Sequence, residues 1–405
     1  MENPSNADDQ AASETVLPHL ELRDGSPTII SDSASLAAFA GAVQQGQGPV
    51  ALDAERASGY RYTARAYLVQ VRRNGAGTAL IDPIPVTDLT TLNAAIGNTE
   101  WILHAATQDL PCLAELGMRP DRLFDTEVAA RLLGREKVSL AGLVASELGR
   151  GLDKGHGSAD WSLRPLSDEQ LRYAALDVEP LIELREILAD DLAAKGRWEI
   201  AQQEFDHLLS FAPKDRGPEP WRRLSGMHTL KSPRQWALAR ELWWTRDGIA
   251  ERTDNAPGRV LPDSAIVAAV KADPTSASEL LAVKGFHGRG AGKYRSDWWS
   301  ALQRARTLSA DQLPERPPRG DGPPPPRSWA DRDPVAAARL AHAREGLSRV
   351  AEQWGVAPEM LVSPDLMRRV CWDPPEDLDA FLVAGGARPW QVELCAPILR
   401  AALRT

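Results

Sequence analysis

The sequence predicts an α/β domain built on a mixed sheet, followed by one or two all-α helical domains. Candidate strands come first and then alternate with helices, which is typical of a mixed sheet with helices on its faces. After residue 220 no segment shows the alternating pattern of a convincing strand, whereas several begin with helix-capping sequences. At 405 residues the chain is also longer than a single hydrophobic core usually supports.

The first part of the chain contains the candidate strands. In chain order the expected elements are strands at 48–55, 67–73, 78–82 and 101–105, a helix from about 107, the short run LFDT, and helices near 126–134 and 139–148. The turn sequence NGAG between the second and third strands predicts an antiparallel hairpin. Ser167 and Gln170 form a capping box, so a long helix is expected to begin there.

The second part is predicted to be helical. Ser232, Pro233 and Gln235 combine an N-cap, a first-turn proline and a capping-box glutamine, which predicts a helix over WALARELWWTRDGIAER. Shorter helices are expected within 262–273, 276–285 and 293–308.

The third part repeats the order of helix starts in the second. Pro334 follows Pro233 by 101 residues and Pro364 follows Pro262 by 102, and each precedes a helical segment. This spacing predicts a weak internal repeat of a small helical domain.

Charge is distributed unevenly along the chain. The formal net charge is −9, but residues 221–310 contain 15 Lys and Arg against 8 Asp and Glu, whereas residues 1–220 contain 20 against 34. A basic segment beside an acidic one predicts a polyanion-binding module attached to a part that concentrates cations. No apolar run approaches the ~20 residues of a membrane-spanning helix, and residues 1–27 lack a hydrophobic signal core, so a soluble, cytoplasmic protein is expected.

Two acids interrupt an apolar run. In VALDAERASGY, residues 50–60, Asp53 and Glu55 lie two positions apart, so a strand would project both from one face. Such neighbours raise each other's pKa unless a cation neutralises them, and carboxylate oxygens suit Mg²⁺ or Mn²⁺. Alone, the pattern fits a solvated strand end better than a metal site.

Three further residues extend this group. Asp109 follows a candidate strand at the start of a helix, and Tyr173 and Asp177 lie four residues apart, on one helix face. Each also has an ordinary structural explanation. Asp109 could be a first-turn acid favoured by the helix dipole, Tyr173 a core aromatic, and Asp177 a solvated acid. Only their combination with Asp53 and Glu55 indicates a site.

In this order and with these neighbours, the motifs resemble the DEDD exonucleases of the tyrosine-containing branch, and within it the ribonuclease D family. The matching motifs are LDAE, HAATQDLPCL and YAALD, together with LFDTEVAARLLG and ADWSLRPLSDEQLRYAALDV, and they extend over roughly residues 30–210. In the second part, LWWTRDGIAER, LPDSAI and LLAVKGF resemble the HRDC domain, a helical nucleic-acid-binding module. One departure is Arg56, which stands where the family pattern has an apolar or small residue and either faces away from the site or touches a phosphate.

The resemblance implies a ribonuclease H-like exonuclease fold for the first part and a domain division for the chain. We expect a disordered acidic tail at 1–27, an exonuclease domain at 28–213, an HRDC-like domain at 221–310, a proline-rich linker at 311–333 and a degenerate second HRDC-like domain at 334–405. The three folded parts are called the first, second and third domains.

The resemblance also implies the catalytic residues. The ligands of two divalent cations, Mg²⁺ or Mn²⁺, would be Asp53, Glu55, Asp109 and Asp177, and Tyr173 would orient the attacking water. The expected activity is metal-dependent 3′–5′ exoribonuclease hydrolysis of single-stranded RNA 3′ ends, with tRNA precursors or other structured RNA as substrates and nucleoside 5′-monophosphates as products. Two alternatives remain open: a DNA exonuclease of the proofreading type, which would use the same residues, and a catalytically inactive adapter that only binds nucleic acid.

The second domain carries a candidate nucleic-acid-binding turn, KGFHGRGAGKYR. Its cations, with Phe286 and Tyr294 interleaved, suit phosphates and stacked bases, although the rings could instead pack in the helical core. The predicted binding residues are Lys284, Arg289, Lys293 and Arg295. The tryptophans expected to pack between helices are Trp236, Trp243, Trp244, Trp298 and Trp299.

Three histidines and two acids are given no catalytic role. His104, His156 and His287 show no metal-ligand spacing. Asp125 is expected to be a structural acid at a strand end, and Asp160 a loop residue.

Overall fold

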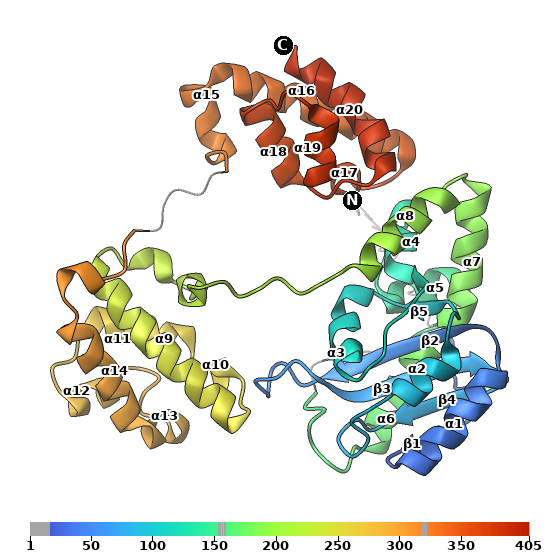
Figure 1. Cartoon of the computed structure of the whole chain (residues 1–405), viewed down its shortest axis with the longest axis horizontal. Helices are drawn as coiled ribbons and strands as arrows, with labels where there is room; N and C mark the ends of the chain where they lie inside the picture. Colours follow the sequence, from blue (N-terminus) through green and yellow to red (C-terminus); the bar gives the residue numbers. More distant parts are fainter. Residues whose placement is uncertain (1–16, 153–154, 156, 158, 317–321, 405) are drawn as a thin grey trace, which may run out of the picture.

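The computed structural model describes residues 17–152, 155, 157, 159–316 and 322–404. Figure 1 shows three bodies: one contains the sheet, and the other two are helical. The predicted order of an α/β domain followed by helical domains is confirmed.

The first domain is built on a six-stranded mixed sheet. Its strands are β1 (Ile29–Ile30), β2 (Gln47–Arg56), β3 (Ala66–Asn74), β4 (Gly77–Ile81), β5 (Trp101–Leu103) and β6 (Leu123–Asp125). They lie in the order β1-β4-β3-β2-β5-β6. β2, β3 and β4 pair antiparallel, whereas β1 pairs with β4, β5 with β2, and β6 with β5 in parallel. The predicted hairpin and mixed sheet are therefore confirmed.

Helices cover both faces of this sheet. They are α1 (Ser33–Gln45), α2 (Thr90–Ile96), η1 (Ala106–Gln108), α3 (Leu110–Glu115), α4 (Thr126–Leu133), α5 (Leu140–Leu148), α6 (Asp168–Val178), α7 (Leu181–Ala194) and α8 (Trp198–Leu209). Val50, Leu52 and Ala54 of β2 pack with α1, α2 and α3, whereas Ala51 packs with α4, α5 and α7. Because side chains alternate along a strand, Asp53 projects to the same face as Ala51.

Some elements differ from the sequence prediction. β1, α1 and α2 are not predicted, and the long helix expected from Ser167 is two helices, α6 and α7. Pro180 lies between them and lacks the N–H donor that a continuous helix would need. The capping box of Ser167 and Gln170 is confirmed at the start of α6.

The prediction of a disordered tail is wrong for residues 17–27. Leu20 is buried, and its backbone N–H donates to the carbonyl of Gly151 at 2.8 Å. Asp24 pairs with the buried Arg72 at 2.6 Å. These contacts fix the segment against the first domain, while residues 1–16 lie outside the described chain.

The second and third domains consist of helices in the part of the chain that the structure describes. The second contains η2 (Pro220–Arg223), η3 (Met227–Thr229), α9 (Pro233–Thr253), α10 (Pro257–Val260), α11 (Asp263–Ala272), α12 (Ala277–Ala282), α13 (Arg289–Lys293), α14 (Arg295–Thr307) and η4 (Ala310–Gln312). The third contains η5 (Pro326–Ser328), α15 (Trp329–Arg332), α16 (Pro334–Trp354), α17 (Pro358–Leu361), α18 (Pro364–Trp372), α19 (Leu378–Ala384) and α20 (Pro389–Leu403). Over the described residues, no helix combines the length and the apolar character needed to cross a bilayer.

Four helices of the third domain begin 101 residues after their counterparts in the second, whereas the final helices α14 and α20 begin 94 residues apart. α9 and α16 each contain 21 residues, and α10 and α17 each contain four. The starting pairs are Pro233 and Pro334, Pro257 and Pro358, and Ala277 and Leu378. This order supports the predicted internal repeat.

The packing of the tryptophans is as predicted with one exception. Trp243 and Trp298 are buried, and Trp236 and Trp299 are partly buried in the same core. Trp244 is 45% exposed, so the prediction that it packs between helices is wrong. Adjacent helical positions point about 100° apart, and here Trp243 takes the inward one.

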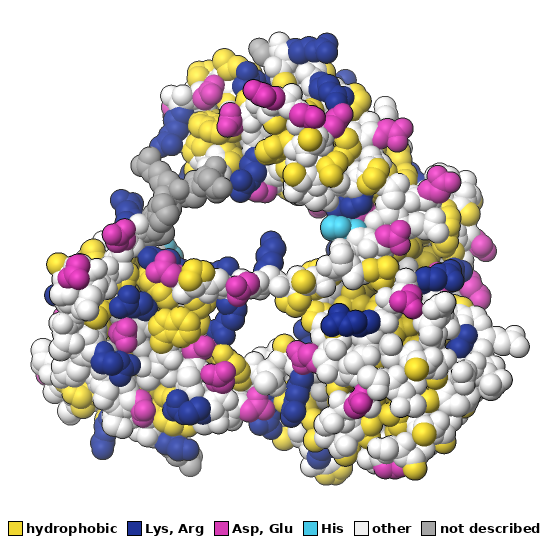
Figure 2. Space-filling model, viewed as in Figure 1, with side chains coloured by type: hydrophobic (Ala, Val, Ile, Leu, Met, Phe, Trp, Pro, Cys, Tyr) yellow, Lys and Arg dark blue, Asp and Glu magenta, His cyan; other side chains and the backbone are white. Residues whose placement is uncertain are grey.

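Contacts between distant segments join the domains. The indole N–H of Trp390 in α20 donates to Glu204 of α8 at 2.7 Å. The hydroxyl of Tyr62, in the loop after β2, donates to Asp247 of α9 at 3.1 Å. Figure 2 shows the three domains arranged around an opening, which the chain between the first and second domains crosses.

Asp125 is the structural acid that the sequence predicts. It ends β6 and is 1% exposed, and its carboxylate accepts hydrogen bonds from four backbone N–H groups. Two of these belong to Glu127 and Val128 at the start of α4, and two to Ala105 and Ala106 in the turn after β5. One side chain therefore holds together the ends of two neighbouring strands.

Asp125→Ala would leave these buried donors without an acceptor. We expect the free energy of unfolding of the first domain to fall by about 2–4 kcal/mol. Urea denaturation followed by far-UV circular dichroism would measure it. Asp190→Ala, at an exposed position of α7, is the matched control and should change the value by less than about 0.5 kcal/mol. Equal stability of the two variants would contradict the role given to Asp125.

Candidate active site

β2 presents Asp53 and Glu55 near its carboxyl end. The two residues face the same side of the sheet, as the sequence predicts, and Glu55 is only 9% exposed. Both residues are paired with β3, so β2 cannot turn these carboxylates away without breaking that ladder. The sheet therefore forces the two acids into one partly buried space.

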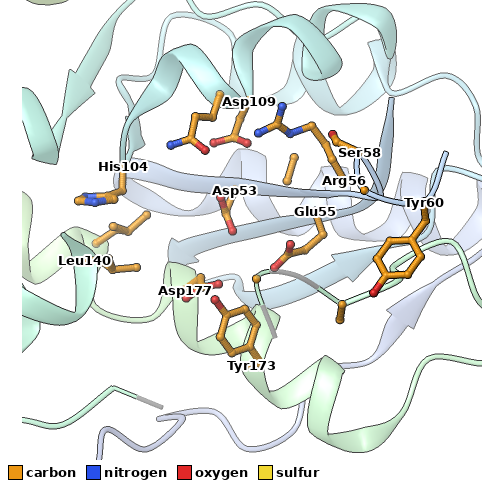
Figure 3. Close-up of a pocket in the computed structure, with 16 residues that line it drawn as sticks. Asp53, Glu55, Arg56, Ser58, Tyr60, His104, Asp109, Leu140, Tyr173 and Asp177 are labelled. Carbon is orange, nitrogen blue, oxygen red and sulfur yellow. The ribbon is translucent and has the colours of Figure 1, made fainter. Parts of the chain in front are cut away.

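Two other segments bring the remaining predicted residues to the same place. α6 packs against β2, β3 and β4 and carries Tyr173 and Asp177 one turn apart. Asp109 lies between η1 and α3, just after the turn that Asp125 fixes. Figure 3 shows Asp53, Glu55, Asp177 and Tyr173 converging, with Asp109 on the other side of Asp53.

The distances suit a metal-binding group. Asp53, Glu55 and Asp177 each offer a carboxylate oxygen, and these atoms all lie within 4.8 Å of one another. Asp109 is 4% exposed and lines the same cavity without belonging to this group of three. Carboxylate oxygens are the ligands that Mg²⁺ and Mn²⁺ prefer, so the residues could hold divalent ions.

Burial raises the pKa values of all four acids, and neighbouring carboxylates add to the shift at Glu55, Asp109 and Asp177. Burial raises the pKa of Asp53 to about 6, and burial with the charges of Asp53, Asp177 and Asp109 raises the pKa of Glu55 to about 10. Burial and the charge of Asp53 also raise the pKa values of Asp109 and Asp177 well above their usual range. Without a cation the group would retain protons near neutral pH, whereas bound cations would displace them.

Tyr173 is positioned as a hydrogen-bonding group. Burial and the charge of Asp177 raise its pKa above the usual value for a phenol, and its hydroxyl is hydrogen-bonded to the Asp177 carboxylate. A phenol with a raised pKa keeps its proton near neutral pH, so Tyr173 cannot act as a strong base. Its hydroxyl can orient a ligand or a water beside Asp177.

A cavity of about 510 Å³ opens over these residues. Besides the five predicted residues, its lining includes Arg56, Tyr60 and His104. His104 bonds Thr126 through Nδ1 at 2.9 Å, and burial lowers its pKa to about 4, so it is neutral. The sequence gives no signal for His104 or Tyr60, because neither has a recognisable spacing to the acids.

Arg56 faces the cavity, which settles the choice that the sequence leaves open. Alternation along β2 sends its side chain to the face opposite Glu55, and Figure 3 shows it there, on the same side of the strand as Asp109. Residues of both faces of β2 line the cavity, with Asp53 and Glu55 on one face and Ala54 and Arg56 on the other. The Arg56 charge opposes the upward pKa shifts of Asp53, Glu55 and Asp109, and Figure 3 shows its guanidinium beside Asp109.

The loop that follows Arg56 connects the cavity with the second domain. The backbone carbonyl of Tyr60 accepts a hydrogen bond from Ala256 at 3.0 Å, and the Tyr60 ring lies under the guanidinium of Arg259 at 4.3 Å. Asp254, which ends α9 in a left-handed conformation, accepts hydrogen bonds from the backbone N–H groups of Tyr62 and Thr63. One rim of the cavity is thus attached to the end of α9.

The predicted nucleic-acid-binding residues lie elsewhere. Lys284, Lys293 and Arg295 are exposed around α13 and do not line the acidic cavity. The side chain of Arg289 lies outside the described part of the structure, as does His156. Phe286 is fully buried against Trp298, and Tyr294 is partly buried beside it, so the prediction that Phe286 stacks on bases is wrong. Binding by the four cations stays a prediction.

Three family models match consecutive parts of the chain. Residues 27–193 match the model described as 3′-5′ exonuclease, residues 235–302 the HRDC domain, and residues 322–403 the 3′ to 5′ exonuclease C-terminal domain. The last match covers the domain that the sequence analysis expects to be a second HRDC-like copy.

Similar proteins span nearly the whole chain. A ribonuclease D of Granulibacter bethesdensis is 31% identical over 363 residues, which cover 88% of this chain and 89% of the relative. A crystal structure of a protein from Bifidobacterium adolescentis is 35% identical with a TM-score of 0.90, covering 96% of this chain and 100% of that one. The crystal structure of Escherichia coli RNase D, titled an exoribonuclease involved in structured RNA processing, is 26% identical with a TM-score of 0.68 over 93% of this chain and 98% of that one.

The raised pKa values predict that divalent ions bind more tightly as the pH rises. A proton on Glu55, whose pKa is about 10, must leave before its carboxylate can bind a metal. We expect affinity for Mn²⁺ to rise by up to about tenfold per pH unit for each proton displaced. Isothermal titration calorimetry between about pH 6.5 and 8.5, in buffers of different ionisation enthalpy, would measure both the Mn²⁺ affinity and the number of protons released. Affinity that does not change with pH, together with no proton release, would contradict this assignment.

Proposed function

The chain belongs to the ribonuclease D family and is a 3′–5′ exoribonuclease, and we propose that it removes nucleotides one at a time from single-stranded RNA 3′ ends as nucleoside 5′-monophosphates. The observation that carries this proposal is the group of carboxylates of Asp53, Glu55 and Asp177, all within 4.8 Å of one another in a cavity that Tyr173 also lines.

The family depends on divalent metal ions, and the acidic group fits them. We propose two ions, Mg²⁺ or Mn²⁺. The residues that would hold them are Asp53, Glu55, Asp109 and Asp177. The fit rests on the carboxylate-only donor set and on the raised pKa values, which burial causes at Asp53 and which burial and the neighbouring acids cause at Glu55. Bound ions would activate water and stabilise charge on the leaving 3′-oxygen.

The protein side chains would position the reacting groups. Tyr173 would hydrogen-bond the attacking water beside Asp177 and keep it in line with the terminal phosphodiester. Arg56, which lines the cavity beside Asp109, would contact a phosphate oxygen of the terminal nucleotide. These roles require a free, flexible 3′ end, because the acids lie at the bottom of a partly buried cavity.

Structured RNA such as tRNA precursors is the substrate class that we propose. The Escherichia coli relative is titled an exoribonuclease involved in structured RNA processing, and the basic second domain beside the cavity offers a surface for the rest of such an RNA. The comparisons do not favour the two alternatives that the sequence leaves open, a proofreading-type DNA exonuclease and an inactive adapter.

The direct test compares matched substrates. With Mg²⁺, a 5′-labelled single-stranded RNA should shorten one nucleotide at a time from its 3′ end and release 5′-monophosphates, and it should be cut faster than DNA of the same sequence. Gel electrophoresis and chromatography of the products would measure this. Faster cutting of DNA, or no hydrolysis with either Mg²⁺ or Mn²⁺, would overturn the proposal.

Variants of the site should separate metal binding from water positioning. Asp53→Asn should abolish both Mn²⁺ binding and hydrolysis, because it removes a charged ligand. Tyr173→Phe should lower kcat about 10²-fold while Mn²⁺ affinity stays within about threefold, because only a positioning hydrogen bond is lost. Steady-state kinetics and calorimetry would measure these effects, and Asp121→Asn, an exposed acid after α3, is the control. If Asp53→Asn bound Mn²⁺ as the unaltered protein does, the ligand assignment would be wrong.

A further inference from the structure

A groove of about 380 Å³ runs between α9 and α14 in the second domain, apart from the acidic cavity. The residues that line it are Trp244, Thr245, Gly248, Ile249 and Arg252 from α9, and Ser296, Asp297, Ser300 and Arg304 from α14. Trp244, Gly248 and Arg252 lie four residues apart and so form one stripe along α9. The same spacing relates Ser296, Ser300 and Arg304 on α14. The stripe on α9 is about 12 Å long at 1.5 Å per residue.

Trp244 supplies an aromatic surface at one end of the groove. Its indole is 45% exposed, although it stands beside the buried Trp243. The two rings are nearly perpendicular, with centroids 4.9 Å apart, so Trp243 supports the Trp244 ring without covering it. An exposed, supported indole is suited to stack on a nucleic-acid base of any sequence.

Cations and small residues complete the groove. Arg252 is exposed and, within the described residues, has no carboxylate partner within salt-bridge distance. Arg304 is held in place by Glu241 at 3.2 Å and Thr245 at 3.0 Å. Gly248, with Ser296 and Ser300 opposite it, leaves room for a backbone to approach. The single acid of the groove, Asp297, can accept a hydrogen bond from a base amino group.

The internal repeat provides a comparison within the same chain. All five groove residues of α9 have counterparts 101 residues later that line a groove between α16 and α20. Their order in that third-domain groove is Glu345, Gly346, Arg349, Val350 and Gln353. Thus the groove follows from the helical architecture. Among the described residues, the second-domain groove has an exposed tryptophan and an arginine without a carboxylate partner, whereas Arg349 of the third-domain groove lies 4.0 Å from Glu345. In the third domain Trp244 is replaced by an acid and Arg252 by a neutral residue.

The second-domain groove leads toward the acidic cavity. Arg252 lies two residues before Asp254, the end of α9 that binds the loop of Tyr62 and Thr63. That loop also contains Tyr60, which lines the acidic cavity. A strand lying along α9 from Trp244 past Arg252 would therefore arrive at the rim of the site that receives the 3′ end.

We propose that the groove between α9 and α14 binds the single-stranded RNA segment 5′ to the nucleotide being removed, with a base stacked on Trp244 and a phosphate paired with Arg252. The inference rests on the proposed function of the acidic cavity and adds a second contact with the same substrate. The charge of the second domain, 15 Lys and Arg against 8 Asp and Glu over residues 221–310, favours RNA over an acidic protein partner. The four cations predicted around α13 are not needed for this site.

The test measures RNA binding and hydrolysis in the full-length protein. Trp244→Ala should raise the Kd for a fluorescent single-stranded RNA of about 12 nucleotides by about 5- to 30-fold, measured by anisotropy in EDTA. Trp244→Phe, which retains a ring, should recover most of the affinity. Arg252→Glu should weaken binding and reduce the slope of log K against log salt by about one or more. Both positions are exposed, and thermal unfolding would check that the variants fold.

Substrate length separates this groove from the acidic cavity. A dinucleotide reaches only the cavity, so Trp244→Ala should leave its hydrolysis within about twofold while kcat/KM for the longer RNA falls in parallel with affinity. Glu345→Ala and Arg349→Ala in the third-domain groove are the matched controls. They should change neither the hydrolysis of the dinucleotide nor kcat/KM for the longer RNA. If the unaltered protein hydrolyses both substrates and Trp244→Ala and Arg252→Glu behave like it on the longer RNA, the groove proposal is wrong and the proposed function stands. If the unaltered protein hydrolyses no RNA, the proposed function itself fails.

Discussion

The crowding of four carboxylates in one partly buried cavity is the constraint on which the arrangement of the first domain depends. Asp53 and Glu55 share one face of β2, Asp177 approaches from α6, and Asp109 from the turn after β5. Nothing in these acids favours their proximity, as their raised pKa values show. The proximity is imposed by contacts elsewhere: the paired sheet fixes β2, a capping box fixes the start of α6, and the buried Asp125 fixes the turn that precedes Asp109. The surrounding domain thus holds these acids together, and divalent ions are the partners that suit them.

The contrast between the acidic site and the elements that hold it explains which parts of the structure could be predicted from the sequence. The strands β2, β3 and β4 have long apolar runs and a glycine turn, and the helices α6 and α9 begin with capping boxes, so local signals agree with the fold. β1 has only two residues, and α1 is rich in alanine with little separation between its faces, so neither produces a clear period. The acids of the site were predictable because strand and helix spacing places pairs of them on common faces, and the motifs supply the rest.

Other site features depend on tertiary structure that no local pattern encodes. Arg56 lies on the face of β2 opposite Glu55 and still lines the cavity, because the cavity extends around β2 beyond its short pairing with β5. Tyr60 and His104 reach the cavity through loops and turns that are fixed by distant residues. Trp243 and Trp244 are indistinguishable by composition, yet one is buried and the other exposed, because the position of the neighbouring helices decides which ring turns inward. Phe286 is a similar case. Its place among cations in the sequence suggests an exposed ring, but the ring is buried against Trp298.

The separation of charge between domains follows from the same constraint. A cavity that gathers acids for metal ions repels a polyanionic substrate until ions bind, so it is poorly suited to capture RNA by itself. The second domain has the opposite balance of charge, and its α9 ends against the loop that forms one rim of the cavity. On the proposed function, attraction and cleavage would fall to separate domains, which contact each other through the loop of Tyr60 and the end of α9. The third domain shows a similar order of helices but carries Glu345 where the second has Trp244, so the two grooves differ in chemistry. A helical unit fixes where a groove lies, and the residues at a few positions along it decide whether RNA can be its ligand.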